Sequence, residues 1–541
     1  MKKWSFVLVL ILSLGAVWPF FYSGFFPMHD DTQVVRVYEM SQAFRDGQFP
    51  VRLVVDLGYG YGYPIFNFYA PLHYYFGAFF NLIGFDALLA TKIMFVFGII
   101  FSGLTMYFLA RRFWGEVGGI VAGIFYIYAP YHAVDIYVRG AVGEFWAMAF
   151  TPLVFWGLAK IFYREQNGVL IGGLGLAGVI LSHNLTALML LPFLVLSGLF
   201  AFFFSGKRKL FAIDSLLLTL CGLSLSAFYW LPALTEMGLT RVSEQIGGGA
   251  NFRDHFVYLD QLWASPWGFG GSAPGRLDGM SFIIGKLHFL VGLLSLFWLS
   301  RRGVIILGWG FLILAVFLLT GYSNFLWASL PVMAFLQYPW RFLAMVILAI
   351  SFLAGAFFLF LSKRGKLFLG VGLSLVMISL NLKYFRPQNF LNKTAADYLA
   401  RENILWTTSR ISDEYLPKDF LRPQKKEEVA WQKLEILQGK GVLKRQKVRY
   451  NQQFFDLEAK TEGEVVLNTA FFPGWRVLVD DQEREPIVKS GRMEVFLPTG
   501  TQRLEVKFVN TNLRNLANLI SLTSAGFFMF FRLVKRPWQK T

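Results

Sequence analysis

Residues 4–22, WSFVLVLILSLGAVWPFFY, form an apolar run long enough to cross a membrane as a helix. Beyond Pro27 stands Met28-His29-Asp30-Asp31, so an imidazole and two adjacent carboxylates are expected where that helix leaves the bilayer. Adjacent aspartates can hold a divalent cation, or one of them can act as a general base. They can equally be part of a solvated loop in which Asp31 caps a following helix.

The composition is that of a membrane protein. Of the 541 residues, 55% are hydrophobic and only 16% are charged, and the mean hydropathy is +0.49. The net charge of +17 is best explained by Lys and Arg gathered in cytoplasmic loops, so nucleic acid is not expected as a partner. Cys221 is the single cysteine, which excludes an internal disulfide and a cysteine metal cluster. No small-residue cleavage site follows the first apolar run, which is therefore read as an uncleaved helix.

Apolar length and basic clusters together predict about twelve membrane-spanning helices, with both termini in the cytoplasm. All basic clusters next to a span then fall on one side. These clusters are Arg111-Arg112, Arg164, Lys207-Arg208-Lys209, Arg301-Arg302, Lys363-Arg364-Lys366 and Lys535-Arg536-Lys540. The predicted spans are residues 4–22, 86–110, 117–130, 142–161, 168–183, 185–204, 211–231, 282–299, 303–320, 342–361, 367–383 and 513–532.

Two further helices are expected in the long outer loop, residues 23–85. Residues 33–46 have the helical spacing of an amphipathic helix that lies at the membrane interface. Residues 66–83 are apolar, but a crossing there would place Arg111-Arg112 outside. We therefore predict an interfacial helix over 66–83, with Tyr69, His73, Tyr74 and Tyr75 as its aromatic belt.

The polar region 385–510 is predicted to be a separate extracytoplasmic domain, mostly a β-sandwich. Its second half contains short apolar runs with strand-like alternation, and Asp480-Asp481-Gln482 and Pro498-Thr499-Gly500 are turn sequences between them. The predicted organisation is thus a transmembrane domain over 1–384, this β-domain, and a last helix with a basic tail over 511–541.

The polar residues that could carry chemistry gather on the predicted outer face, while the helix centres are nearly free of charge. Arg341 lies within Tyr338-Pro339-Trp340-Arg341-Phe342, where a forked guanidinium could bind phosphate or only anchor the helix at the interface. Asp135 could react or could be neutralised by Arg139. The full candidate set is His29, Asp30, Asp31, Asp135, Arg139, Glu144, His183, His255, Tyr338 and Arg341.

This arrangement resembles the integral-membrane glycosyltransferases of the C superfamily (GT-C). Several stretches are more closely similar to a bacterial and archaeal membrane family named after a 6-pyruvoyl-tetrahydropterin synthase related domain. They are GYGYPIFNFYAPL (60–72), RGAVGE (139–144), SHNLTA (182–187), FYWLPA (228–233), QYPWRF (337–342) and SDEYLP (412–417). FPGWRVLVD (472–480) resembles the outer β-domain of related bacterial glycosyltransferases.

The resemblance implies a GT-C-like fold and a sugar donor carried on a polyprenyl phosphate, used on the outer face of the cell membrane. By analogy, Asp30 or Asp31 would deprotonate the acceptor, and Asp135 would be the second acidic position. The acceptor could be a glycan, a lipid or a protein. Some members of the superfamily hold a divalent ion such as Mg²⁺ or Mn²⁺ with such carboxylates, and others hold none. No zinc-binding histidine triad of the pterin synthase type is evident, because the histidines lie in different loops.

Two other functions stay open at this point. The protein could be a transporter or flippase for a lipid-linked glycan. It could also be a non-catalytic assembly protein whose β-domain binds a cell-surface polymer. The gathering of acidic residues at one face favours the enzyme, since transporters place charges nearer the bilayer midplane.

Overall fold

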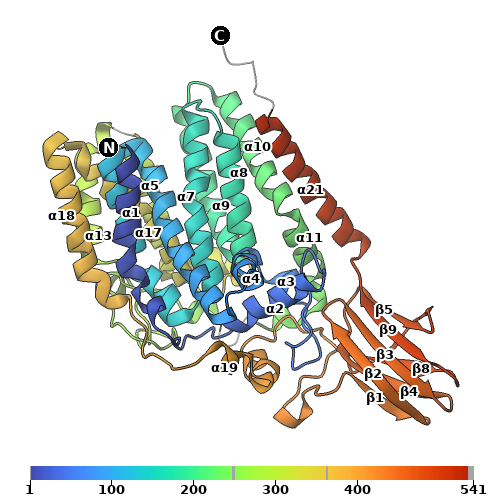
Figure 1. Ribbon diagram of the computed structural model, residues 1–541. Helices are drawn as coiled ribbons and strands as arrows, with labels where there is room; N and C mark the ends of the chain where they lie inside the picture. The colour runs from blue at the N-terminus through green and yellow to red at the C-terminus, as the bar shows by residue number, and fades with distance from the viewer. Residues whose placement is uncertain (1, 246–249, 302, 361–362, 534–541) are drawn as a thin grey trace.

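The computed structural model describes residues 2–245, 250–301, 303–360 and 363–533. A helical region carries a β-sheet region at one end (Figure 1). The start of α1 and the end of α21 both lie at the opposite end of the helical region, on different sides of it (Figure 1). Arg302 and the basic tail, Lys535 to Lys540, lie outside the described residues, and so does the part of the charge prediction that rests on them.

Each segment predicted to span the membrane contains helix, but the predicted count of twelve spans is not confirmed. Among the residues that the structure describes, six helices are long and apolar enough to cross a membrane, or up to eight if each of two bent pairs is one span. The helices of this region are α1 (Lys2–Val17), α5 (Ala87–Ile127), α7 (Val142–Phe162), α8 (Gly168–Ser182), α9 (Asn184–Phe204), α10 (Arg208–Leu225), α11 (Ala227–Glu236), α13 (Lys286–Leu293), α14 (Gly303–Leu319), α17 (Leu343–Ala354), α18 (Lys363–Asn381) and α21 (Asn512–Leu533).

The helix α5 contains two of the predicted spans, joined by a sharp reversal. Gly115 has φ 76° and ψ −176°, a backbone conformation open mainly to glycine. The two arms pack against each other through small residues. A Cβ added to Gly123 would lie 2.8 Å from the carbonyl oxygen of Gly103, and one added to Gly119 would lie 3.0 Å from that of Tyr107. The second arm is only about 18 Å long, too short to cross alone.

Other segments fall short of a full span for similar reasons. The helix α8 has 15 residues. The α10 and α11 helices meet at an angle of 73°, and α14 is bent by 79° from the short helix α15 (Asn324–Ser329). The helix α13 has 8 residues and continues as a 3₁₀-helix, Leu294–Arg301. These shorter and bent helices are the reason why the predicted count of twelve is not confirmed.

The helices predicted in the loop 23–85 are present as α2 (Gln33–Arg45), α3 (Ile65–Phe68) and α4 (Leu72–Leu82), but their environment is not a wet interface. Arg36 and Glu39, on the polar side of α2, are buried, because Arg36 meets Tyr74 and Glu39 meets Tyr450. His73 and Tyr74 are fully buried as well. The prediction of an aromatic interfacial belt was wrong for these two residues, which form part of the protein core.

The predicted strands of the C-terminal region form two antiparallel sheets. One sheet has the strand order β1-β4-β8-β7 and the other β2-β3-β9-β5-β6. Alternate residues of both sheets, such as Phe455, Val465 and Val495, share one hydrophobic core. The strands are β1 (Leu434–Gln438), β2 (Gly441–Arg449), β3 (Gln452–Ala459), β4 (Gly463–Ala470), β5 (Trp475–Val479), β6 (Gln482–Arg484), β7 (Ile487–Lys489), β8 (Arg492–Leu497) and β9 (Arg503–Phe508).

A buried polar network fixes this β-sheet region and α21 to the first loop. Arg514 donates to Glu236 at 2.9 and 3.1 Å and to the Pro473 carbonyl at 2.8 Å. Asn67 donates to the same Glu236 carboxylate at 2.7 Å and accepts a hydrogen bond from Arg52 at 2.9 Å. Since buried charges cost little only when they are paired and hydrogen-bonded, this network specifies how the parts meet.

Candidate active site

The centre of the candidate site is a cluster of charges where the chain turns from α6 (Pro130–Ala133) into α7. A π-helical turn, Val134–Arg139, is followed by Gly140 with φ 67°. Arg139 pairs with Asp135 and, at 2.9 Å, with Glu144, while the Tyr131 hydroxyl donates to Glu144 at 2.5 Å. Asp135 and Glu144 are fully buried, so Asp135 lies behind Arg139 as its ion-pair partner.

Arg341 joins this cluster from the 3₁₀ turn Pro339–Phe342, which leads into α17. Its guanidinium Nε lies 3.9 Å from Glu144 and its charge lies 5.3 Å from the centre of the Tyr338 ring. The residue is only 8% exposed, yet Nε and Nη1 have no hydrogen-bond partner among the residues that the structure describes. A buried guanidinium with two free donors is costly unless a ligand completes it, and phosphate oxygens fit that fork.

The loop that carries Asp30 is held against this cluster by backbone hydrogen bonds. The amide of Asp30 donates to the Arg139 carbonyl at 2.9 Å, and the amide of His29 donates to the Val138 carbonyl at 3.0 Å. Gln33 adds a side-chain bond to the Gly140 carbonyl at 2.9 Å. The Asp30 carboxylate acts electrostatically on Arg139, Tyr69 and Tyr74, and no donor among the described residues is hydrogen-bonded to it. Asp30 is therefore the first-loop carboxylate on the side of the charge cluster.

Asp31 has different neighbours. Its carboxylate interacts electrostatically with Lys393 and Tyr398, which belong to the segment that follows α18. Burial raises the pKa of Asp31 from 3.8 to about 6, and Lys393 partly offsets that effect. The prediction that both aspartates face one cavity with Asp135 has no support in these contacts: the structure brings Asp30 to the cluster and turns Asp31 toward the C-terminal region.

We expect Asp31→Asn to increase thermal stability near neutral pH and to change little in acid. Because the pKa is raised in the folded state, the stability contributed by the protonated carboxyl is complete below 3.8 and is lost as the pH rises through about 6. With allowance for the partial exposure of Asp31, the variant should gain about 1 kcal/mol in its free energy of unfolding at a pH above the folded-state pKa. Unfolding in detergent at about pH 4 and about pH 7.5 measures it. The exposed Asp419→Asn is the matched control, and an equal shift at both pH values would contradict the prediction.

The predicted histidines occupy three different positions. His183 ends α8 and caps α9: its Nδ1 accepts from the Thr186 amide at 3.3 Å and lies 2.8 Å from the Thr186 hydroxyl, which leaves Nε2 to carry the proton. Burial lowers the pKa of His183 to about 3, and its charge interactions are with Glu144, Arg341 and Arg139. The His29 ring bonds the Phe269 carbonyl at 2.9 Å, and His255 bonds Ser272 and packs on Tyr338. Only His183 therefore joins the charge cluster directly.

Sequence reasoning missed His73 and Arg36 as members of the site. His73 is fully buried, neither ring nitrogen has a partner, and it lies within electrostatic range of His183 and Arg36. Arg36 lies 4.6 Å from the Tyr69 ring centre and donates to the Tyr74 hydroxyl at 3.2 Å. A signal was available for His73, since a histidine in the apolar helix α4 is unusual, but it was read as part of an interfacial belt. Arg36 lies on the amphipathic helix α2, whose helical spacing was read as an interface.

A divalent cation held by Asp30, Asp31 and Asp135 stays a prediction. In the described ranges, no group of three or more His, Cys, Asp or Glu side chains is arranged to hold a metal ion. The different directions of Asp30 and Asp31 explain why these carboxylates do not form such a group. The residues present therefore do not fit the ion, and no chemical step below depends on one.

Comparison with known proteins gives a family and several distant likenesses. The family model described as "6-pyruvoyl-tetrahydropterin synthase related domain; membrane protein" matches residues 66–386. An uncharacterized protein of Lactococcus lactis subsp. cremoris (strain MG1363) is 25% identical over 278 residues, which are 48% of this chain and 45% of that protein. The chain thus spans less than half the length of this relative.

The solved structures it resembles are membrane-protein structures at low identity. AglB, the oligosaccharyltransferase of Archaeoglobus fulgidus, in complex with an inhibitory peptide and a dolichol-phosphate, is 13% identical, with a TM-score of 0.49 over 79% of this chain and 61% of AglB. The mycobacterial arabinofuranosyltransferase AftD is 12% identical, with a TM-score of 0.45 over 73% and 29%. ArnT of Cupriavidus metallidurans, bound to undecaprenyl phosphate, is 13% identical, with a TM-score of 0.36 over 69% and 62%.

Proposed function

This chain belongs to the family of membrane proteins with a 6-pyruvoyl-tetrahydropterin synthase related domain, and we propose that it is a glycosyltransferase whose sugar donor is a lipid phosphate. The observation that carries the proposal is Arg341. A buried guanidinium with two free donors stands at the end of an apolar helix, where the headgroup of a membrane lipid would lie. Glu144 and the aromatic rings of Tyr338 and Trp340 hold it in place.

The neighbouring carboxylate supplies the second requirement of the reaction. A hydroxyl acceptor must lose its proton as it attacks, and Asp30 is a carboxylate within electrostatic range of Arg139 that accepts no hydrogen bond from the described part of the chain. In the proposed step the acceptor oxygen forms a bond to the anomeric carbon of the sugar, and its proton passes to Asp30. The bond between that carbon and the phosphate oxygen breaks, and the lipid phosphate leaves. Arg341 stabilises the negative charge that the phosphate gains in this step.

His183 and Arg139 complete the site in supporting roles. The Nε2–H of His183 is a neutral donor because burial keeps the imidazole uncharged, so it can bind a sugar hydroxyl or a phosphate oxygen without adding charge. Arg139 is held by Asp135 and Glu144 and lies 4.6 Å from the Trp340 ring. Asp135 was expected to be catalytic. Because it is completely buried, we assign it instead the role of positioning Arg139.

The test uses the purified protein in liposomes with a panel of radiolabelled sugars on undecaprenyl or dolichyl phosphate. We expect at least one donor to lose its sugar, with release of the lipid phosphate, at a rate far above that of protein-free liposomes. If intact donors cross the bilayer and none is cleaved, the protein is a transporter and the proposal fails. The proposal also fails if donors bind to the protein but are neither cleaved nor moved across the bilayer in the presence of cell-envelope extract.

A further inference from the structure

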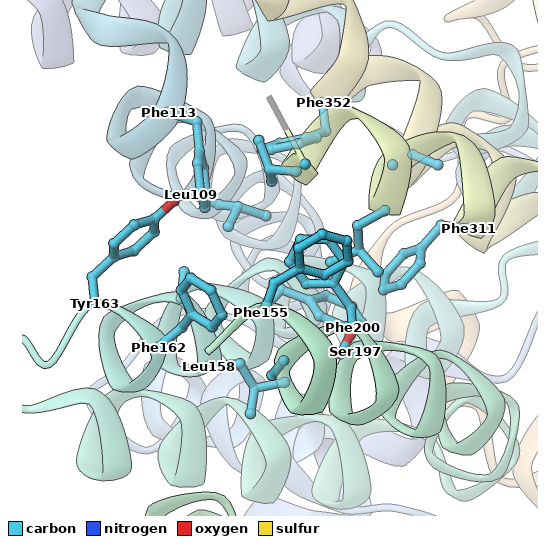
Figure 2. Close-up of a pocket in the computed structure, with 18 of the residues that line it drawn as sticks. Leu109, Phe113, Phe155, Leu158, Phe162, Tyr163, Ser197, Phe200, Phe311 and Phe352 are labelled. Carbon is cyan, nitrogen blue, oxygen red and sulfur yellow. The ribbon is translucent and has the colours of Figure 1, made fainter. Parts of the chain in front are cut away.

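An apolar cavity of about 260 Å³ lies among α5, α7, α9, α14 and α17, away from the polar site. Phenylalanine rings surround it, among them Phe155, Phe200 and Phe311 (Figure 2). Two lining residues carry hydroxyls, Ser197 and Tyr163, and the Ser197 hydroxyl donates to the Phe193 carbonyl at 2.8 Å. A cavity with so few polar groups favours a hydrocarbon chain over water.

The cavity belongs to the opposite end of the same helices that carry the site. The helix α17 begins beside Arg341 and reaches the cavity at Leu348 and Phe352, about 10 to 16 Å further along. The helix α7 begins beside Glu144 and lines the cavity from Phe155 to Phe162, about 16 to 27 Å away. These five helices contribute residues from the half that lies away from the charge cluster, and Phe211 at the start of α10 also lines the cavity.

The interior of the bundle is filled between the cavity and the site. Phe193 is fully buried, and its ring centre lies 5.2 Å from that of Phe311 and 6.3 Å from that of Phe342. A chain that occupies both places therefore runs along the surface of the bundle that faces the bilayer before it enters the cavity.

The geometry points to a cavity that receives the distal part of the lipid donor's isoprenoid chain and so sets a minimum chain length. This inference rests on the proposed function, because it takes the lipid phosphate to be bound at Arg341. The hydrocarbon core of a bilayer is about 30 Å thick, so the fatty acyl chains of one leaflet extend about 15 Å. An acyl chain whose headgroup lies at Arg341 would reach the part of the cavity that α17 lines, but not the part that α7 lines from Phe155 to Phe162. A long polyprenyl chain reaches the whole of it.

Filling the cavity tests the inference with two probes, undecaprenyl phosphate and the much shorter geranyl phosphate. The variants Ala159→Phe, on α7, and Ala201→Phe, on α9, add a ring to the cavity lining. Leu191→Phe is the matched control, since it adds a ring to an exposed apolar face of α9. Binding is measured in detergent by titration, and the melting temperature of each variant reports whether it is folded.

We expect each cavity variant to bind undecaprenyl phosphate about tenfold more weakly while geranyl phosphate binding is unchanged, because only the long chain loses apolar contacts there. The control should bind both probes like the original protein. Equal effects of the cavity variants on both probes, or no effect on either, would overturn the inference. Competition for undecaprenyl phosphate by an equal amount of phosphatidylglycerol would also overturn it. The proposed function fails separately, if Arg341→Ala leaves both probes bound.

Discussion

Arg341→Ala should bind undecaprenyl phosphate about 10²- to 10⁴-fold more weakly than the original protein, since each of the two hydrogen bonds lost to a charged group contributes about 1.5 to 3 kcal/mol. The two free guanidinium donors are the groups that the phosphate would use. Arg341→Lys keeps the charge but loses the fork, so its affinity should lie between the two. Titration in detergent micelles over a range of lipid phosphate concentration measures both variants.

Arg253→Ala is the control for a general loss of positive charge, because Arg253 is an exposed residue of the short turn Phe252–Asp254 and lies over the Phe252 ring. It should bind the lipid phosphate normally. If Arg341→Lys binds as tightly as the original protein, a charge at the interface is sufficient, and Arg341 is then a snorkelling anchor rather than a phosphate ligand.

The helical segments were predictable from the sequence, while their geometry was not. Apolar runs located each helix, because a bilayer requires long apolar stretches wherever the chain crosses. The reversal at Gly115 also lies where the Arg111-Arg112 pair predicted a turn. The bend between α10 and α11 and the shortness of α8 depend on packing against neighbouring helices, which no single-chain pattern encodes. The number of spans therefore could not be fixed in advance.

The site was predictable to the extent that local charge marked it. Asp30, Glu144, Arg139, His183 and Arg341 were named from the sequence, and the structure gathers them at one place. Asp31 was predicted as the equal of Asp30, yet adjacent residues of a loop point in different directions, and contacts from residues 393–398 decide which one joins the cluster. Arg36 and His73 escaped notice because burial by the C-terminal region and by α7 is a long-range property.

Asp30→Asn should reduce sugar transfer by about 10²- to 10⁴-fold, the usual contribution of a general base. The asparagine is nearly the same shape, and the backbone bond from residue 30 to the Arg139 carbonyl does not involve the side chain. Binding of undecaprenyl phosphate should therefore stay within about twofold of the original, since Arg341 is the proposed phosphate ligand. Initial rates of sugar release in liposomes, with the best donor of the panel, measure the loss.

Asp31→Asn is the matched control, because it changes the adjacent carboxylate in the same way. The electrostatic partners of Asp31 are Lys393 and Tyr398 rather than the charge cluster, so its variant should retain most of the transfer rate. The two variants thus distinguish a general base at Asp30 from a general base at Asp31. If Asp31→Asn abolishes transfer and Asp30→Asn does not, the base is Asp31, and a carboxylate whose pKa is about 6 must then reach the acceptor through a rearrangement of the first loop.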